Sequence, residues 1–261
     1  MSTKKRVVIV GYPKSGNTWL SRLIGQLLDC PVVGFFNDPE NNDIAIEGGD
    51  RKSNFEVYKA HHAWDQIEEL LPLIYKIIYI VRDPRDIAVS GAYFFNVDRF
   101  ENLNKLESQD KFAAMAETVS YGSSYAWCHI SWAQHVRGWL KRTPEVLIVR
   151  YEDLLNNGPA QLKRASLFLG LESSSQEIDH VLSLQDFNTV KQKFMDSYDK
   201  RKIKHLRSGK DKQYIHLLRA SEIEKIERTS LNEMACLDYQ LVSGDLIPMS
   251  TVHKTDESQF P

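Results

Sequence analysis

Cysteine is scarce in this chain of 261 residues, and so is an excess of either charge. The three cysteines, Cys30, Cys128 and Cys236, are widely separated, and no C-x-x-C pair or Cys/His metal-ligand spacing occurs. We therefore expect reduced thiols in a cytoplasm-like compartment. The 33 Lys and Arg residues are balanced by 35 Asp and Glu, which gives a net charge of −2. General nucleic-acid and anionic-membrane binders usually carry a basic excess, so we expect neither as a partner.

Long hydrophobic runs are also missing. Only four consecutive apolar residues precede Gly11, and Lys76 interrupts the most apolar later stretch, LIYKIIYIV. A signal-peptide core and a membrane span both need longer runs. We therefore expect a soluble cytoplasmic protein.

Short apolar runs and amphipathic segments alternate along the chain, which predicts strands alternating with helices. The expected strands are Val7–Val10, Phe55–Ala60, Ile74–Val81 and Val146–Val149. The expected helices follow Gly16 and Asp83 and cover Trp64–Leu71, Tyr125–Leu140, Ala160–Leu169, Gln176–Leu184 and the region near Ala220–Glu233. This pattern predicts an α/β fold, in which helices flank both faces of a central parallel sheet, within one domain of residues 1–242. Residues 243–261 are polar and are expected to form a loose tail.

The segment GYPKSGNTW (residues 11–19) follows the first expected strand and begins like a phosphate-binding loop. Gly11 and Gly16 have the spacing of G-x-x-x-x-G-K-[ST], but Asn17 stands at the lysine position and Lys14 lies inside the turn. A turn that opens a helix presents unpaired N–H groups and the positive end of the helix dipole, which attract an anion. The side chains that can add hydrogen bonds are Ser15, Asn17 and Thr18. An ordinary βα turn is the alternative, and the strand–loop–helix context favours a phosphate site.

Two further clusters follow expected strands. Lys59 and His61 in YKAHHAW lie two residues apart and so point to one side of an extended chain. His61 can serve there as a general base, and a core or surface histidine is the alternative. Arg82 and Ser90 in RDPRDIAVS can together hold a phosphate, through a bidentate fork and a hydroxyl. The alternative for this stretch is a capped helix with solvated Arg and Asp side chains.

A basic segment lies near the C-terminal end. Lys191–Lys212 contains nine Lys and Arg against three Asp. Such a run is usually a solvated face, but Arg207-Ser208-Gly209 within it can instead close over a polyanion. Aromatic residues that can stack on a purine are Trp19, Tyr151, Phe187 and Tyr214, although each by itself is as typical of a core.

Taken in order, YPKSGNTW, KAH, VRDPRDIAVS and YEDLL resemble the cytosolic sulfotransferases and their bacterial relatives, from about Val7 to Tyr214. The resemblance implies a nucleotide-kinase-like α/β fold that uses 3′-phosphoadenosine-5′-phosphosulfate (PAPS) as sulfuryl donor, without a metal. It implies that residues 14–18 hold the phosphosulfate and that Lys14 stabilises charge on the departing nucleotide. His61 matches the catalytic base, and Lys59 matches a lysine that assists transfer.

The resemblance also implies the remaining donor contacts. Residues matching those that bind the 3′-phosphate are Arg82, Ser90, Arg207 and Gly209, and those at the adenine are Trp19, Tyr151 and Phe187. The sequence departs from the family at Ser208, which replaces a basic residue, and at Lys212-Gln213-Tyr214, which replaces G-D-W. Gly91 replaces a bulky residue and predicts a larger pocket nearby.

The sequence therefore predicts a sulfotransferase acting on a hydroxyl or amine of a small molecule. The variable parts expected to build the acceptor pocket are Phe35–Glu47, Tyr93–Phe100 and Tyr121–Trp132. The acids expected to favour a polar or cationic acceptor are Asp38, Glu40, Asp43 and Glu47. Two rivals remain: a nucleoside or nucleotide kinase with an irregular phosphate loop, and a nucleotide-binding protein without turnover. Against the kinase, Arg82 rather than a Walker-B aspartate ends the Ile74–Val81 strand.

Overall fold

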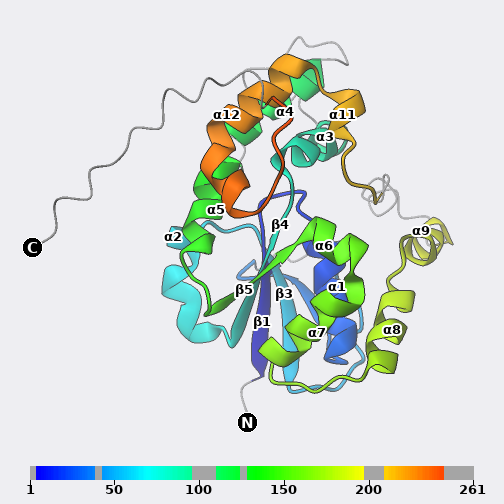
Figure 1. The fold of residues 1–261 in the computed structure, drawn as a ribbon. Coiled ribbons are helices and arrows are strands. Elements are labelled where there is room, and N and C mark those ends of the chain that lie inside the picture. Colours follow the sequence, from blue (N-terminus) through cyan, green and yellow to red (C-terminus); the bar gives the residue numbers. More distant parts are fainter. Residues whose placement is uncertain (1–3, 39–42, 96–109, 124–127, 197–208, 244–261) are drawn as a thin grey trace, which may run out of the picture.

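The computed structural model describes residues 4–38, 43–95, 110–123, 128–196 and 209–243. Five strands form one sheet in the order β2-β3-β1-β4-β5, and every paired neighbour is parallel. The strands are β1 (Lys5–Val10), β2 (Val32–Phe35), β3 (Phe55–Ala60), β4 (Lys76–Val81) and β5 (Val146–Arg150). Figure 1 shows this sheet at the centre of the molecule with helices around it.

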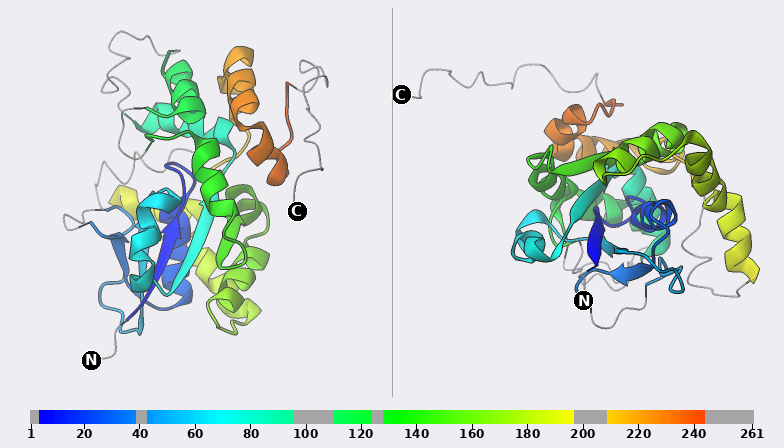
Figure 2. Two further views of the ribbon diagram at one scale, coloured as in Figure 1. Left: turned by 90° about the vertical axis from the view of Figure 1, so that its left-hand side faces the viewer. Right: turned by 90° about the horizontal axis from the view of Figure 1, so that it is seen from below.

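Helices connect the strands and cover both faces of the sheet, as expected for parallel strands. Those up to β5 are α1 (Asn17–Leu27), α2 (Trp64–Ile67), a 3₁₀ helix (Glu68–Leu73), α3 (Pro84–Phe94), α4 (Asp110–Tyr121) and α5 (Trp132–Leu140). After β5 come α6 (Tyr151–Asn156), α7 (Gly158–Phe168), α8 (Ser175–Leu184), α9 (Phe187–Asp196), α11 (Tyr214–Leu217) and α12 (Ala220–Cys236). The two further views show α7 and α8 gathered on one side of the sheet and α5 and α12 on the other (Figure 2).

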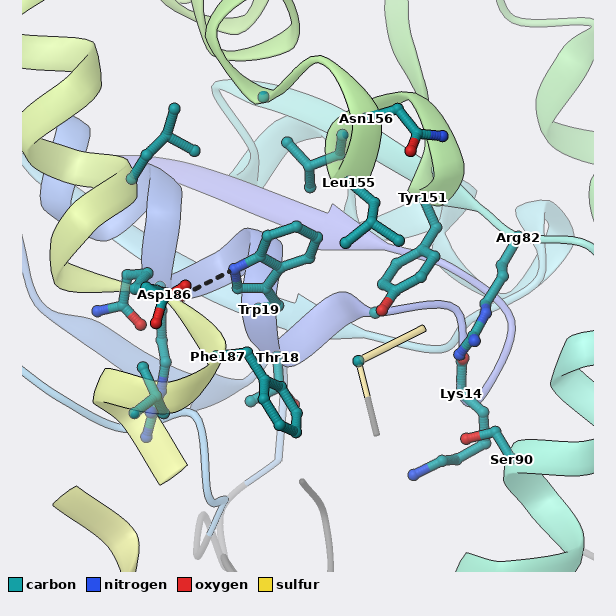
Figure 3. Close-up of a pocket in the computed structure, with 18 of the residues that line it drawn as sticks. Lys14, Thr18, Trp19, Arg82, Ser90, Tyr151, Leu155, Asn156, Asp186 and Phe187 are labelled. Atoms are coloured by element: carbon teal, nitrogen blue, oxygen red, sulfur yellow. Dashed lines mark hydrogen bonds between the residues drawn. The ribbon is translucent and has the colours of Figure 1, made fainter. Parts of the chain in front are cut away.

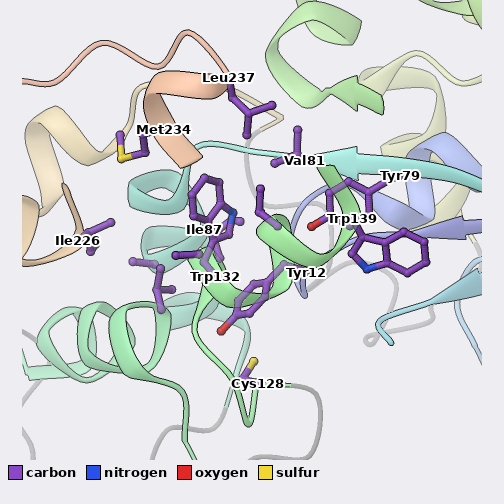
Figure 4. Packing of buried hydrophobic residues seen from close by; sticks show 14 of the residues in the cluster. Tyr12, Tyr79, Val81, Ile87, Cys128, Trp132, Trp139, Ile226, Met234 and Leu237 are labelled. Carbon is purple, nitrogen blue, oxygen red and sulfur yellow. The ribbon is translucent and has the colours of Figure 1, made fainter. Parts of the chain in front are cut away.

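Alternate residues of the central strand belong to two separate cores. Val8 and Val10 pack with side chains of α3, α4, α5 and α12, whereas Val7 and Ile9 pack with side chains of α1, α7 and α8. This alternation follows from the two-residue period of a strand. In the first core, Trp132 and Trp139 of α5 are fully buried, and Trp139 stacks on Tyr79 of β4 (Figure 4).

The predicted strands are confirmed, with Phe55–Ala60 matching its expected bounds and the others differing by one or two residues at an end. Of the expected helix Tyr125–Leu140, residues 125–127 lie outside the described ranges and residues 128–131 are not helical, because helix α5 begins only after Ser131. The Ser131 hydroxyl accepts from the Gln134 N–H, and the Gln134 side chain accepts from the Ser131 N–H. This capping box defines the helix start. The helix expected at Trp64–Leu71 continues past Pro72, but in 3₁₀ form.

The carboxyl ends of four strands meet at one edge of the sheet. There β1 leads into the loop before α1, and β3 into His61. At the same edge β4 leads into Arg82, and β5 into Tyr151. Ligands of open α/β sheets bind at this edge, so the fold brings the sequence clusters together.

The described ranges lack two features, a membrane-spanning helix and a cluster of metal ligands. No helix there is long and apolar enough to cross a membrane. The same part of the chain contains no group of three or more His, Cys, Asp or Glu side chains arranged to hold a metal ion. The proposed division at residue 242 stays a prediction, since the described ranges stop at residue 243.

Candidate active site

The loop between β1 and α1 forms a tight turn that exposes the start of α1. Lys14 has a φ of 73° and Gly16 a φ of 103°, so both lie in the left-handed region. No side chain caps α1 at Gly16, and the N–H groups of its first turn have no partner within the helix. An added Cβ at Gly16 would lie 2.7 Å from the Tyr151 ring. Glycine is therefore required here, and the unpartnered first turn favours an anion.

Two polar side chains of this loop are buried. Asn17 is buried, and its Nδ2 donates to the Gly11 carbonyl at 3.3 Å and to the Ala60 carbonyl at 3.0 Å. The Nδ2 atom of Asn17 thus ties the loop to the end of β3. Ser15 is fully buried, and its hydroxyl has no hydrogen-bond partner among the described residues. The expected role of both residues in binding the donor stays a prediction.

Arg82 lies at the end of β4, between the loop and a later segment. Its guanidinium donates to the carbonyl of Lys14 at 3.4 Å and to that of Lys210 at 3.0 Å, and it lies 4.3 Å from the Tyr151 ring centroid. Ser90 lies on α3, whose start is capped by Asp83 accepting from the Arg85 N–H, with Pro84 in the first turn. The cap residue and the proline position match the prediction.

A cavity of about 440 Å³ opens between these elements (Figure 3). Nine residues predicted to bind the donor line it, namely Lys14, Gly16, Thr18, Trp19, Arg82, Ser90, Tyr151, Phe187 and Gly209. In Figure 3, Lys14, Arg82 and Ser90 form one end of the cavity, and Trp19 and Phe187 lie at the other. A cationic end and an aromatic end suit a ligand with phosphates on one side and a planar base on the other.

The aromatic end is built from three elements. Trp19 of α1 meets Tyr151 of α6 edge to face, with ring centroids 5.7 Å apart, and its Nε1 donates to the Gln185 carbonyl at 3.2 Å. Phe187 begins α9, and a Cβ added at Gly209, where φ is 64°, would lie 2.7 Å from its ring. Burial raises the pKa of the Tyr151 hydroxyl, so the ring is neutral. Arg207 and Ser208, also predicted to bind the donor, fall outside the described residues.

His61 does not line the cavity but lies directly behind the loop. Its Nδ1 is 2.7 Å from the Gly11 carbonyl, which can only accept, so Nδ1 carries the proton and Nε2 the lone pair. Burial, followed by the charge of Lys59, lowers the pKa of His61 to about 3. His61 is therefore a neutral imidazole of defined tautomer at physiological pH.

Helix α5 fixes the segment that carries His61. His135 Nε2 donates to the His61 carbonyl at 3.2 Å, and its Nδ1 accepts from the Tyr79 hydroxyl at 2.8 Å. Trp139 Nε1 donates to the carbonyl of His62 at 3.2 Å. Two successive carbonyls after β3 are thus held by side chains one turn apart on α5.

Lys59 is also behind the cavity, and a carboxylate holds it. Its Nζ lies 2.5 Å from Oδ2 of Asp43 and 3.4 Å from the hydroxyl of Thr18, which lines the cavity. The Coulomb effect of Lys59 on His61 is consistent with the prediction that the two side chains share one side of the chain. Lys14 lies farther forward, with its Nζ 3.5 Å from the centroid of the Phe94 ring.

Several lining residues were missed from the sequence. Arg22, the most notable, is 5% exposed and donates to the Ile44 carbonyl at 2.7 Å. It follows Thr18 by four residues, so the helical period could have revealed it. The other lining residues not predicted are Leu154, Leu155, Asn156, Gly158, Pro159, Leu182, Gln185, Asp186, Val190 and Phe194. They come from α6 to α9 and the joining segments. Leu154 and Leu155 belong to the YEDLL motif, and no motif marks the others.

Two departures from the family pattern have structural explanations. An added Cβ at Gly91 would lie 2.4 Å from Cε of the buried Met115, so methionine fills the space and the prediction of a larger pocket is wrong. The segment Lys212-Gln213-Tyr214 directs its three backbone N–H groups at the Asp86 carboxylate, at 2.6, 2.8 and 3.2 Å. Asp86 thus secures the segment that follows Gly209.

Comparisons with known proteins agree with this geometry. A family model described as the sulfotransferase domain matches residues 4–238. The guinea pig 3-alpha-hydroxysteroid sulfotransferase is 29% identical over 206 residues, 73% of this chain and 68% of that protein. Human sulfotransferase 1E1 is 30% identical over 207 residues, 71% of this chain and 66% of that protein.

A solved structure shows the same fold. Mouse sulfotransferase SULT7A1, complexed with PAP, superposes with a TM-score of 0.68 and 23% identity, covering 90% of this chain and 88% of that one. The family match favours sulfuryl transfer over the kinase alternative, and an enzyme over a non-catalytic binder. The chain belongs to the family of PAPS-dependent sulfotransferases.

Proposed function

We propose that the cavity binds PAPS and that the chain transfers its sulfuryl group to a hydroxyl or amine of a small metabolite. The observation that carries this proposal is the composition of the cavity wall, with Lys14, Arg82 and Ser90 at one end and Trp19 and Phe187 at the other. The donor has about four negative charges, so cations and N–H donors must converge on it. In this proposal, the aromatic side chains at the other end of the cavity bind its adenine.

Each residue has a distinct task in this proposal. The N–H groups of the first turn of α1 and the Thr18 hydroxyl bind the phosphosulfate, and Arg82 and Ser90 bind the 3′-phosphate. Lys14 stabilises the negative charge that develops on the oxygen between sulfur and phosphorus as the sulfur–oxygen bond breaks. Its Nζ lies 3.5 Å from the centroid of the Phe94 ring, at the cationic end of the cavity.

His61 takes the proton of the acceptor as the acceptor oxygen or nitrogen attacks sulfur. The hydrogen bond from Nδ1 to Gly11 leaves Nε2 as the basic atom. Positioning and charge stabilisation supply most of the rate, as in phosphoryl transfer. Lysine and backbone N–H groups take the place of a divalent ion in this scheme.

The four acids expected to favour a cationic acceptor differ in their surroundings. Two of the four acids expected to favour a cationic acceptor are engaged by the protein's own cations, Asp43 by Lys59 and Glu47 by Arg22. Glu40 lies outside the described residues, and Asp38 is half-buried. We propose a small polar molecule as the acceptor.

The test combines transfer and binding. Purified protein is incubated with ³⁵S-labelled PAPS and pools of hydroxyl and amine metabolites, with and without chelator, and products are identified by mass spectrometry as a gain of one sulfuryl group. We expect chelator-resistant transfer. Lys14→Ala and His61→Ala each lower turnover by about 10²–10⁴-fold, and His61→Ala still binds PAP in calorimetry. Mg²⁺-dependent consumption of ATP, or near wild-type turnover by His61→Ala, contradicts the proposal.

A further inference from the structure

A buried ion pair joins the segment after β2 to β3. Lys59 and Asp43 have side chains only 5% and 6% exposed, and the atoms Nζ and Oδ2 are 2.5 Å apart. The second oxygen of Asp43 accepts from the Ala45 N–H at 2.7 Å. The hydrogen bond from Ala45 therefore holds the same carboxylate that pairs with the lysine. Removing one partner of a buried pair leaves an uncompensated charge, so the two side chains depend on each other.

The pair is directed at the donor cavity. The Lys59 ammonium lies 3.4 Å from the Thr18 hydroxyl, and Thr18 lines the cavity in the first turn of α1. The ammonium also lies 4.2 Å from the Phe35 ring centroid. A hydroxyl, an aromatic ring and a carboxylate thus surround the amine and leave it one defined position.

We propose that Asp43 is a positioning residue for sulfuryl transfer, which holds the Lys59 ammonium protonated and directed at Thr18 beside the phosphosulfate of bound PAPS. This inference rests on the proposed function, in which Lys59 assists the transfer. It also replaces the sequence-based expectation for Asp43. Both of its oxygens already accept hydrogen bonds from this chain, so the residue serves the lysine rather than a cationic acceptor.

The surrounding charges explain why the lysine needs this partner. Burial lowers the pKa of Lys59, Asp43 raises it, and the guanidinium of Arg22 lowers it. The carboxylate of Glu47 faces Arg22. The charge of Lys59 in turn lowers the pKa of His61. Asp43 is the carboxylate that offsets burial directly. Without its charge, burial and Arg22 act unopposed and the amine loses its proton closer to neutral pH.

The first experiment measures the titration of Lys59 and needs no acceptor. The ¹⁵N resonance of its amine is followed against pH and assigned by its loss in Lys59→Met. In Asp43→Asn the amide oxygen can still accept from the Ala45 N–H, and an NH2 group replaces the oxygen that faces Lys59, so the charge and the hydrogen bond to the lysine are both removed. We expect the midpoint to fall by about one pH unit or more, a roughly tenfold change in proton affinity. Asp50→Asn, an exposed acid on the same connection, is the matched control and leaves the midpoint unchanged. An unchanged midpoint in Asp43→Asn overturns the proposal.

The second experiment is a double-mutant cycle on consumption of ³⁵S-labelled PAPS, with water as the acceptor or with an acceptor identified above. With water, its oxygen bonds to sulfur, the bond from sulfur to the bridging oxygen breaks, and PAP and hydrogen sulfate form. We expect Asp43→Asn and Lys59→Met each to lower the rate by about 10-fold or more, and the double variant to be no slower than Lys59→Met. Asp43→Glu, which keeps the charge, recovers part of the rate and shows that the loss is not misfolding.

The outcomes separate this inference from the proposed function. Wild-type rates in Lys59→Met contradict the role of Lys59 itself. Wild-type rates in Asp43→Asn, with Lys59→Met impaired, contradict only the role given to Asp43. A further loss when Asp43→Asn is added to Lys59→Met shows that Asp43 acts independently of the lysine, and this also overturns the inference.

Discussion

The Gly11 carbonyl, at the end of β1, is a meeting point of the site at the scale of single residues. It accepts from Nδ1 of His61 at 2.7 Å and from the Asn17 side chain at 3.3 Å. The proposed base and the donor loop therefore share one acceptor. An added Cβ at Gly11 would lie 2.4 Å from the Ile80 carbonyl. Close packing against β4 is what fixes this acceptor.

Replacing Asn17 tests this shared acceptor. Asn17→Ala removes the donors to the Gly11 and Ala60 carbonyls in a buried place. We expect the free energy of unfolding to fall by about 1–3 kcal/mol, measured by denaturant titration. Asn17→Asp costs more, since a carboxylate would face two carbonyl oxygens. Equal free energies of unfolding for the wild type, Asn17→Ala and Asn17→Asp would contradict the view that the Asn17 side chain holds the loop to the end of β3.

The pKa of His61 should respond to the donor. In the donor-free protein, burial comes first and the charges of Lys59 and Lys14 add to it, which lowers this pKa to about 3. Bound phosphates are anions near both lysines and offset their charges, so saturation with PAP is expected to raise the pKa. Proton NMR titration of the His61 ring, with and without PAP, measures the change. An unaltered or lowered value contradicts the proposed position of the nucleotide.

At the scale of elements, the start of α9 and the segment before α11 close one side of the cavity. Gly209 packs on Phe187, and three N–H groups donated to Asp86 secure the residues that follow. In the proposed function, the donor's adenine is thus bounded by segments far from the loop in sequence. Their contact depends on the absence of a side chain at residue 209.

Gly209→Ala measures that contact. The new Cβ would meet the Phe187 ring at 2.7 Å, at a φ of 64°. We expect the affinity for PAP, measured by calorimetry, to fall by roughly tenfold, about 1.4 kcal/mol. Gly170→Ala is the matched control, because Gly170 also has a positive φ, 79°, but its Cβ would meet nothing within 4 Å. Both variants share the backbone strain, and equal PAP affinities would contradict the packing argument.

The elements that sequence patterns predict well are those whose signals are local. The apolar run of β4 and the Asp83-Pro84 cap of α3 both carry their own signal, and the structure has them as expected. β2 was missed because its four residues, Val32–Phe35, include a glycine and lie beside a register shift. α9 was missed because its basic sequence hides the buried Val190 and Phe194.

The site divides in the same way. Sequence patterns could predict that the loop, His61, Arg82 and Tyr151 lie together. Each follows a strand, and parallel strands bring their carboxyl ends to one edge of the sheet. The partner of Lys59 was beyond reach, since Asp43 belongs to an irregular segment whose path is set by tertiary packing. The inward turn of Asn17 was missed for the same reason, because only the Ala60 carbonyl of a neighbouring strand explains it.

At the scale of the whole molecule, buried charges link the C-terminal helix to the site. Arg85 in the first turn of α3 pairs with Asp83 at 2.6 Å and with Glu227 of α12 at 2.5 Å. Glu227 also accepts from the backbone N–H and the hydroxyl of Ser243. The helix that carries Ser90 is therefore anchored to the last described residues of the chain.

Buried neutral histidines should make the whole fold sensitive to acid. Burial lowers the pKa of His135 to about 4, whereas an unfolded histidine titrates near 6.5. Between these values the unfolded state binds more protons, so stability is fully present above about pH 6.5 and is lost as the pH falls toward 4. The contribution of His135 is on the order of 3 kcal/mol, and His61, with a pKa of about 3, adds a larger loss that extends to lower pH.

His135→Gln tests this linkage. Glutamine does not titrate in this range, and its amide can still donate to the His61 carbonyl. The free energy of unfolding is measured by denaturant titration from neutral pH down to about pH 4.5, where the carboxylates also begin to contribute. The variant is less stable at neutral pH because the ring stacked on Tyr79 is lost, but its stability should decline less steeply with acid than that of the wild type.

His216→Gln, at an exposed position on α11, is the control and should keep the wild-type slope. Parallel pH profiles for all three proteins would mean that His135 takes up its proton equally in the folded and unfolded states, which contradicts its burial between Tyr79 and the His61 carbonyl.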